Sequence, residues 1–202
     1  MTMRGNGLKA AVLIALCWIL FPAASDAEVL AVRNCNWCHG GSASGYPPAP
    51  ALAAQRPQYV AKQLANFRAH TRDTPFSRQY MWGAARNLDT ESVRNLALYF
   101  ASLPPRAASD GVPGLVGLGQ TIYQQGMPEA NIVACVVCHG PNGEGIRDIP
   151  RLGGLDSTYL RRRLEQWNQG YHVAAGPPMI SIASKLSDDQ IEALASYLSF
   201  VE

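Results

Sequence analysis

The sequence predicts an all-α fold made of two homologous domains in tandem. A shift of one hundred positions overlays Cys35 on Cys135 and aligns many of the apolar residues that follow. Both halves carry apolar residues at helical spacing, and neither has an alternating run long enough to build a sheet. We therefore expect a first domain at residues 28–105, a linker at 106–114 and a second domain at 115–202.

Composition narrows the classes of protein to consider. The chain has 202 residues, of which 48% are hydrophobic and 16% are charged, and its formal net charge is +2. This balance supplies enough apolar side chains for a core and excludes a disordered chain. The small net charge also excludes a polybasic nucleic-acid binder, so we expect no nucleic-acid partner.

The amino-terminal residues 1–27 have the order of a secretory signal peptide. Basic residues precede an apolar stretch, and small residues lead up to Ala27. The apolar run 10–24 is shorter than the ~20 residues that cross a bilayer, which disfavours a membrane anchor. We expect cleavage after Ala27, with a shorter signal ending at Ala24 as the alternative, and export to the periplasm.

Each half carries the same cysteine motif. The two copies are Cys35-Asn36-Trp37-Cys38-His39 and Cys135-Val136-Val137-Cys138-His139. The pattern C-x-x-C-H is the attachment signature of haem c. Disulfides and a zinc site are the alternatives, but the two cysteine pairs of a zinc site lie within about 15–20 residues of each other, whereas these pairs are a hundred residues apart. The sequence therefore predicts two covalently attached haem c groups.

The spacing of the motif suits this chemistry. Two cysteines three positions apart share one face of a helical turn, so both thiols can add to the vinyl groups of one porphyrin. The adjacent histidine then reaches the iron as its proximal ligand. This assigns the thioethers to Cys35, Cys38, Cys135 and Cys138, and the proximal ligands to His39 and His139.

Several helices have recognisable ends. Pro57 suits the first turn of a helix. Asp89 is expected to cap the last helix of the first half, which Pro104 follows, and Ser187 and Gln190 form a capping box for the last helix of the second half. Four aromatic residues are expected to pack in the interior or against haem: Trp37, Tyr59, Tyr159 and Trp167.

Two methionines are candidates for the sixth iron ligand. Met81 and Met179 follow the second cysteine of their motifs by 43 and 41 residues, in stretches expected to be irregular. A thioether ligand favours ferrous iron and raises the reduction potential. Met127 has no counterpart in the other half and is expected to pack in the core. His70 and His172 are not equivalent positions, although His172 stays open as an alternative ligand for the second iron.

The two halves differ in charge. Residues 28–107 hold nine basic and four acidic side chains, for a net +5, whereas residues 108–202 hold six basic and ten acidic ones, for a net −4. Such asymmetry can orient a protein toward redox partners of opposite sign. One hypothesis is that the basic first domain docks an acidic partner through Arg68, Arg78 and Arg86.

Beyond these features, the sequence resembles the dihaem cytochromes c4, which consist of two class I cytochrome c domains. The segments that carry the resemblance are 38–40, 50–55, 59–67, Arg72, Met81, 96–103, 138–143, 150–152 and 194–197. The resemblance implies a periplasmic carrier that passes single electrons between redox proteins, from a donor such as a quinol-oxidising complex to an acceptor such as a cytochrome oxidase. It also implies that the carbonyls of Pro50 and Pro150 orient the proximal imidazoles. Peripheral association with the membrane stays open.

The first half departs from the family pattern at its amino terminus. A class I domain crosses an amino-terminal helix over its last helix, yet cleavage after Ala27 leaves only seven residues before Cys35. Seven residues make about two helical turns. We therefore expect a looser first domain with a more exposed haem edge.

An enzyme is the alternative function. The chain could be the dihaem subunit of a redox enzyme, such as flavocytochrome sulfide dehydrogenase or a thiosulfate-oxidising dehydrogenase, or a haem enzyme of the peroxidase type. Catalysis at haem needs an exchangeable sixth position, which two methionine ligands would remove. The sequence therefore favours a non-enzymatic electron carrier.

Overall fold

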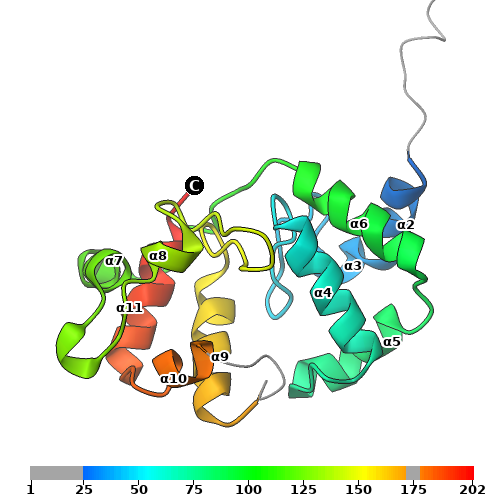
Figure 1. Cartoon of the computed structure of the whole chain (residues 1–202). Coiled ribbons are helices and arrows are strands. Elements are labelled where there is room, and N and C mark those ends of the chain that lie inside the picture. The colour runs from blue at the N-terminus through cyan, green and yellow to red at the C-terminus, as the bar shows by residue number, and fades with distance from the viewer. Residues whose placement is uncertain (1–24, 172–177) are drawn as a thin grey trace, which may run out of the picture.

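The computed structural model describes residues 25–171 and 178–202, and within these ranges the regular structure is helical apart from three isolated β-bridges. Figure 1 shows the two halves side by side. The first half contains α2 (Asp26–Asn34), α3 (Asn36–His39), α4 (Pro57–Arg68), the π-helical turn η1 (Ser77–Met81), α5 (Trp82–Ala85) and α6 (Thr90–Ser102). The second half contains η2 (Pro113–Leu115), α7 (Val116–Gln125), η3 (Pro128–Ala130), α8 (Val136–His139), α9 (Ser157–Asn168), α10 (Met179–Ala183) and α11 (Asp188–Ser199).

The ends of the helices follow the local sequence. Asp89 caps α6 by accepting a hydrogen bond from the Ser92 backbone N–H at 2.7 Å. Ser187 and Gln190 form the predicted capping box at the start of α11, and Pro57 is the first residue of α4. These predictions are confirmed. Caps can be predicted from sequence because the residues that form them lie within one turn of each other.

The first half packs α2 and α4 against α6. Ala31 of α2 is fully buried, and small side chains make up much of this core. Its buried members are Ala31, Ala43, Ala53, Val60, Leu96, Ala97 and Phe100. The helix α2 begins at Asp26 and is capped by Ser25, so it includes two residues that the predicted signal peptide would remove. Residues 1–24, which hold the rest of that predicted segment, lie outside the described residues.

The second half has a larger core around the crossing of α7 and α11. Gly119 of α7 lies directly on the backbone of Ala193 in α11, so the two helices meet without a side chain between them. Tyr123 is fully buried in this core, and Met127 packs against it as predicted. The full set of buried core members is Ala51, Ile122, Tyr123, Ile132, Leu155, Tyr159, Leu160, Leu186, Ile191, Leu194, Ala195, Tyr197 and Leu198.

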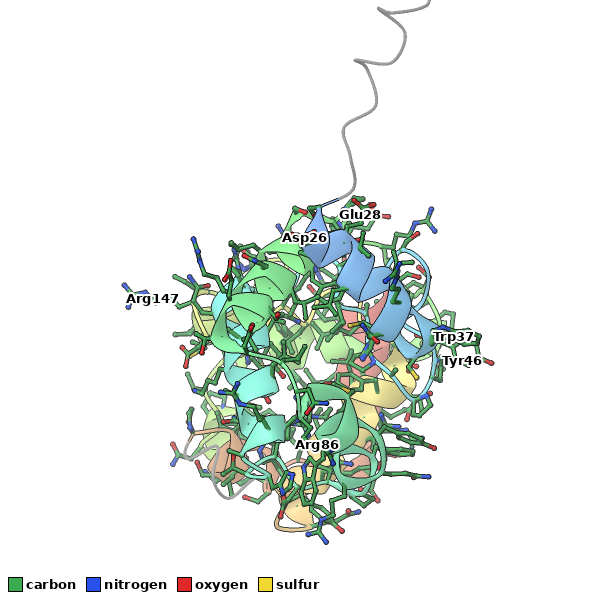
Figure 2. The ribbon with its side chains drawn as sticks, turned by 90° about the vertical axis from the view of Figure 1, so that its right-hand side faces the viewer. Asp26, Glu28, Trp37, Tyr46, Arg86 and Arg147 are labelled. Carbon is green, nitrogen blue, oxygen red and sulfur yellow. The ribbon has the colours of Figure 1, made fainter. Side chains whose placement is uncertain are left out.

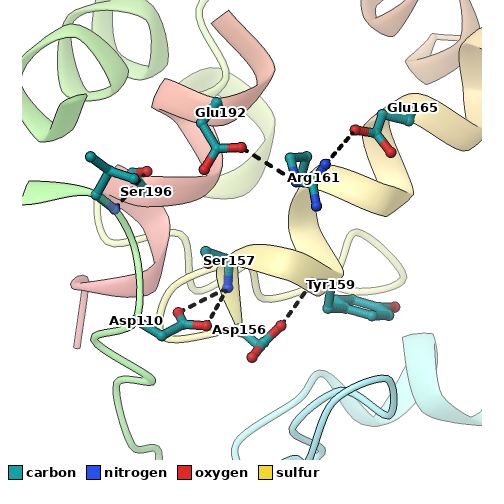
Figure 3. Close-up of polar contacts among 9 residues, drawn as sticks. Asp110, Asp156, Ser157, Tyr159, Arg161, Glu165, Glu192 and Ser196 are labelled. Carbon is teal, nitrogen blue, oxygen red and sulfur yellow. Dashed lines mark hydrogen bonds and ion pairs between the residues drawn. The ribbon is translucent and has the colours of Figure 1, made fainter. Parts of the chain in front are cut away.

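The linker between the halves is anchored to the second half. The carboxylate of Asp110 accepts a hydrogen bond from the Ser157 backbone N–H at 3.0 Å, at the start of α9 (Figure 3). The backbone N–H of Val112 donates to the hydroxyl of Ser196 in α11, also at 3.0 Å. These bonds hold the predicted linker in one path over the second half.

The two halves meet through polar contacts that join residues far apart in the sequence. The side chain of Gln55 donates to the backbone carbonyl of Arg151 at 3.0 Å and accepts from the backbone N–H of the same residue at 2.7 Å. Both residues are buried. Lys62 and Asp148 form an exposed ion pair at 2.7 Å. Other hydrogen bonds between the halves join Arg56 to Glu144 and Gly145, and Arg162 to Pro48.

Within the described ranges, no helix combines the length and apolar character that crossing a bilayer requires.

Candidate haem-binding centres

The two cysteine motifs fold into matching one-turn helices, α3 and α8. Both helices end at a glycine with positive φ, Gly40 at 83° and Gly140 at 82°, a conformation that favours glycine because it has no Cβ. The chain then turns back on itself. The backbone N–H of Gly45 donates to the carbonyl of His39 at 2.8 Å, and that of Gly145 to the carbonyl of His139 at 2.7 Å. The sequence repeat is therefore also a repeat of backbone hydrogen bonds.

Both motif histidines are buried and held in one orientation. His39 and His139 are 7% and 6% exposed. Nδ1 of His39 donates to the carbonyl oxygen of Pro50 at 2.7 Å, and Nδ1 of His139 donates to that of Pro150 at 3.0 Å. Burial lowers the pKa of both imidazoles. Because Nδ1 carries the donated hydrogen, the lone pair of each neutral ring is on Nε2, which is the form that can bind a metal.

In the described part of the chain the four motif cysteines form no disulfide; Cys38 is exposed, and Cys35, Cys135 and Cys138 are half-buried. The two pairs lie in separate halves, and the described residues contain no group of three or more His, Cys, Asp or Glu side chains that could hold a metal ion. The arrangement thus gives two separate pairs of thiols, each next to a buried imidazole.

The two candidate methionines lie on short helical turns. Met81 is the last residue of η1 and directly precedes α5, whereas Met179 is the first residue of α10. Both are half-buried. The expectation that they lie in irregular stretches is wrong, because each stretch closes into a turn of helix just before the capped final helix. π-Helical turns such as η1 are frequent at functional sites. His172 lies outside the described residues.

A half-buried arginine of the first half faces the second half. Arg72 donates to the side chain of Gln63 at 2.8 Å and to the hydroxyl of Tyr159 at 3.4 Å, and both partners are neutral. Its Nε is buried without a hydrogen-bond partner among the described residues. A second arginine, Arg163, lies near enough that burial and the charge of Arg72 lower its pKa to about 10. This positive site suits a carboxylate, and haem carries two of them, so the residues present fit a haem group.

The comparisons with known proteins agree with these features. The cytochrome c family model matches residues 116–201. Cytochrome c4 of Azotobacter vinelandii is 35% identical over 174 residues, which cover 81% of this chain and 82% of that protein. The chain belongs to the cytochrome c4 family. The solved structure of Acidithiobacillus ferrooxidans cytochrome c4 superimposes with a TM-score of 0.78 at 33% identity, covering 83% of this chain and 99% of that one.

As a cytochrome c4, the chain is an electron-transfer protein with two covalently bound haem c groups and is not an enzyme. The predictions of an all-α fold, of two class I domains and of haem c are confirmed. A further relative has a different name: the thiosulfate dehydrogenase electron acceptor of Thiomonas intermedia is 32% identical, covering 95% of this chain and 89% of that protein.

Sequence reasoning missed two features of this cytochrome c4. The pairing of Gln55 with Arg151 and the approach of Arg72 to Tyr159 depend on how the halves dock, and no spacing in the sequence indicates either contact. Trp37 is 88% exposed, so it does not pack in the protein core; its packing against haem, the other half of the expectation, stays a prediction. Its place between two cysteines on a single turn could have suggested this, because that turn buries His39 on its other side.

Proposed function

We propose that this cytochrome c4 carries single electrons between redox proteins in the periplasm, with one haem in each half. In the first half, Cys35 and Cys38 hold the porphyrin and His39 binds its iron. In the second half, Cys135, Cys138 and His139 have the same roles. The amino-terminal segment 1–27 is proposed to direct export.

The orientation of the two imidazoles carries this proposal. A carbonyl that accepts the Nδ1 hydrogen fixes the ring and leaves Nε2 for the iron. Both halves have this contact, at 2.7 Å with Pro50 and 3.0 Å with Pro150. These prolines are therefore proposed to position His39 and His139 as proximal ligands.

Met81 and Met179 are proposed to close the sixth position in each half. A bound haem supplies one-electron chemistry at its iron. If these methionines and the motif histidines both bound the iron, no position would be left open for a substrate, and the haem would supply electron transfer only. His172 is the alternative to Met179 in the second half.

The donor and acceptor are proposed from chemistry and from relatives. A quinol-oxidising complex as donor and a cytochrome oxidase as acceptor would place the chain in respiration. The similarity to the thiosulfate dehydrogenase electron acceptor supports a second donor class, a dehydrogenase that oxidises sulfur compounds. Both versions keep the same role, because the chain accepts electrons one at a time and passes them on.

The visible spectrum of the purified ferric protein tests the ligands. We expect a far-red methionine-to-iron band at the intensity of two haems, and the change Met81→Ala or Met179→Ala should halve it. Met127→Ala is the matched control and should leave the band intact, because Met127 packs in the core. A full band in Met179→Ala would remove Met179 as a ligand and favour His172.

Mass analysis and ligand binding test the carrier role independently. Two covalently attached porphyrins are expected, and neither iron should bind carbon monoxide or react with peroxide. A single porphyrin, or rapid reaction with peroxide in the unmodified protein, contradicts the proposed function.

A further inference from the structure

Two aromatic side chains of the first half project into solvent beside the first cysteine motif. Trp37 is 88% exposed and Tyr46 is 70% exposed. Figure 2 shows both on the same side of the molecule. Their segments are joined, because the backbone N–H of Gly45 donates to the carbonyl of His39 at 2.8 Å. We call this pair, Trp37 and Tyr46, the aromatic platform.

The fold does not explain this exposure. The burial of a large apolar side chain contributes about 1.5–3 kcal/mol to stability. Because both side chains of the platform are mostly exposed, each of them contributes little of this stabilisation. Neither residue caps a helix or belongs to a core cluster. Large exposed apolar side chains that lie together mark interaction sites, and Trp and Tyr are enriched among the residues that dominate binding energy.

The repeat places two apolar side chains at the same positions of the second half. Val137 is 71% exposed and Ile146 is 57% exposed. They are smaller, and the residues near them include Glu144 and Asp148. In Figure 2, Arg147, the neighbour of Ile146, lies on the opposite side of the molecule from the aromatic platform. The second half therefore offers a matched control surface of different size and charge.

Two arginines lie close to the aromatic platform, although one of them, Arg162, also interacts with the carboxylates of Asp156 and Glu165. Residues 29–72 contain no Asp or Glu. Arg33 lies in the last turn of α2, directly before the motif. From the second half, Arg162 donates to the carbonyl of Pro48 at 2.6 Å, two residues after Tyr46. The complementary surface on a partner is therefore apolar at its centre and acidic at its rim.

The sequence suggested that Arg68, Arg78 and Arg86 dock an acidic partner, but two of these arginines already have partners within the chain. Arg78 lies 3.6 Å from the carboxylate of Asp73, and Arg68 donates to the carbonyl of Leu88 at 2.6 Å. Arg86 projects from a different part of the molecule than the aromatic platform (Figure 2). The docking surface is consequently better centred on the platform than on these three residues.

We propose that the aromatic platform is the docking site for an acidic redox protein that exchanges electrons with the first haem. The proposal rests on the proposed function, since Trp37 stands between the two cysteines assigned to that haem. A partner seated on Trp37 would lie next to the cysteines that are proposed to hold the porphyrin, and the nearby arginines would favour a partner of negative charge.

The test measures the rate at which reduced flavodoxin, a small acidic flavoprotein, reduces the complete ferric protein. At low salt, Trp37→Ala combined with Tyr46→Ala should lower the second-order rate constant at least tenfold. The matched pair Val137→Ala and Ile146→Ala should change it less than twofold. The rate of the unmodified protein should fall as salt is added, because opposite charges are screened.

Several results would contradict this proposal. Equal rates in the two variant pairs, or a rate that rises with salt, place the docking site elsewhere. A dimer in sedimentation velocity that Tyr46→Ala abolishes identifies a second copy of the chain as the occupant. Co-sedimentation with phosphatidylserine vesicles that Tyr46→Ala abolishes identifies a membrane surface instead.

Two controls separate docking from folding and from the proposed function. If the Trp37 change prevents haem attachment, Tyr46→Ala alone decides the matter, since Tyr46 lies outside the motif; it should lower the rate about threefold. Reduction by ascorbate and the two-haem spectrum do not depend on docking. If they are normal while the flavodoxin rates are equal, only the docking proposal fails.

Discussion

The crossing of α7 over α11 provides a stability test with a built-in control. A Cβ at Gly119 would meet the backbone carbonyl of Ala193 and would lie 2.7 Å from Cβ of Tyr197. A Cβ at Gly117, in the same helix, meets nothing within 4 Å. The same substitution by alanine should therefore have opposite effects at the two positions.

The magnitudes follow from two terms. Alanine stabilises a helix by up to about 1 kcal/mol relative to glycine, and this is the only term at Gly117. Overpacking costs about 1–3 kcal/mol, and at Gly119 the upper end applies because the contact is with helix backbone that cannot rotate away. We expect Gly117→Ala to raise the free energy of unfolding by up to about 1 kcal/mol and Gly119→Ala to lower it by about 2 kcal/mol.

Thermal unfolding of the haem-loaded protein, followed by circular dichroism, measures both effects. For a chain of this size 1 kcal/mol corresponds to about 2–4 °C in Tm. Gly117→Ala should then raise Tm by up to about 4 °C, and Gly119→Ala should lower it by about 4–8 °C. Equal Tm values for the two variants would refute the close approach of α7 and α11.

Three further predictions concern the interface, a strained turn and a cap. Gln55→Ala removes both hydrogen bonds to Arg151 and leaves the backbone groups of that buried residue unpaired. Urea unfolding should therefore show that the free energy of unfolding falls by about 2–4 kcal/mol. Gln58 is exposed, and the control Gln58→Ala should change the free energy of unfolding by less than about 0.5 kcal/mol. Ala54 has a φ of 55°, so Ala54→Gly should raise the free energy of unfolding by about 0.5 kcal/mol in the same assay; a loss would contradict the strained geometry. Ser187→Ala removes the cap of α11 and should cost about 1 kcal/mol, and an unchanged urea midpoint would show that the cap contributes nothing.

Local signals in the sequence were sufficient for much of the fold. The caps at Asp89 and Ser187 form as predicted, because each depends on a side chain and a backbone group three residues apart. The repeat was visible because the two cysteine motifs and the prolines that follow keep the same spacing. The contacts of His39 with Pro50 and of His139 with Pro150, eleven residues apart in both halves, were implied by the resemblance to the cytochromes c4 and not by the spacing itself.

The surroundings of the two candidate methionines could not be predicted from local sequence signals. The register of Met81 and Met179 was visible in the sequence, but the turns that carry them were expected to be irregular. In the structure these residues belong to η1 and α10. Short helical turns depend on how a segment packs against its neighbours as well as on its own composition, and for that reason composition alone did not reveal them.

By itself the sequence determined the helical class, the duplication, the haem motifs and the ends of the main helices, because all of these arise from interactions within a few residues or from a repeated spacing. Only the tertiary structure decided that Gln55 reaches Arg151, 96 positions away, and that Trp37 points into solvent while His39 on the same turn is buried. The first feature depends on which surfaces of the two folded halves meet. The second depends on which side of a one-turn helix faces the protein interior. That choice is made by packing across the whole molecule, which leaves no periodic trace in the chain.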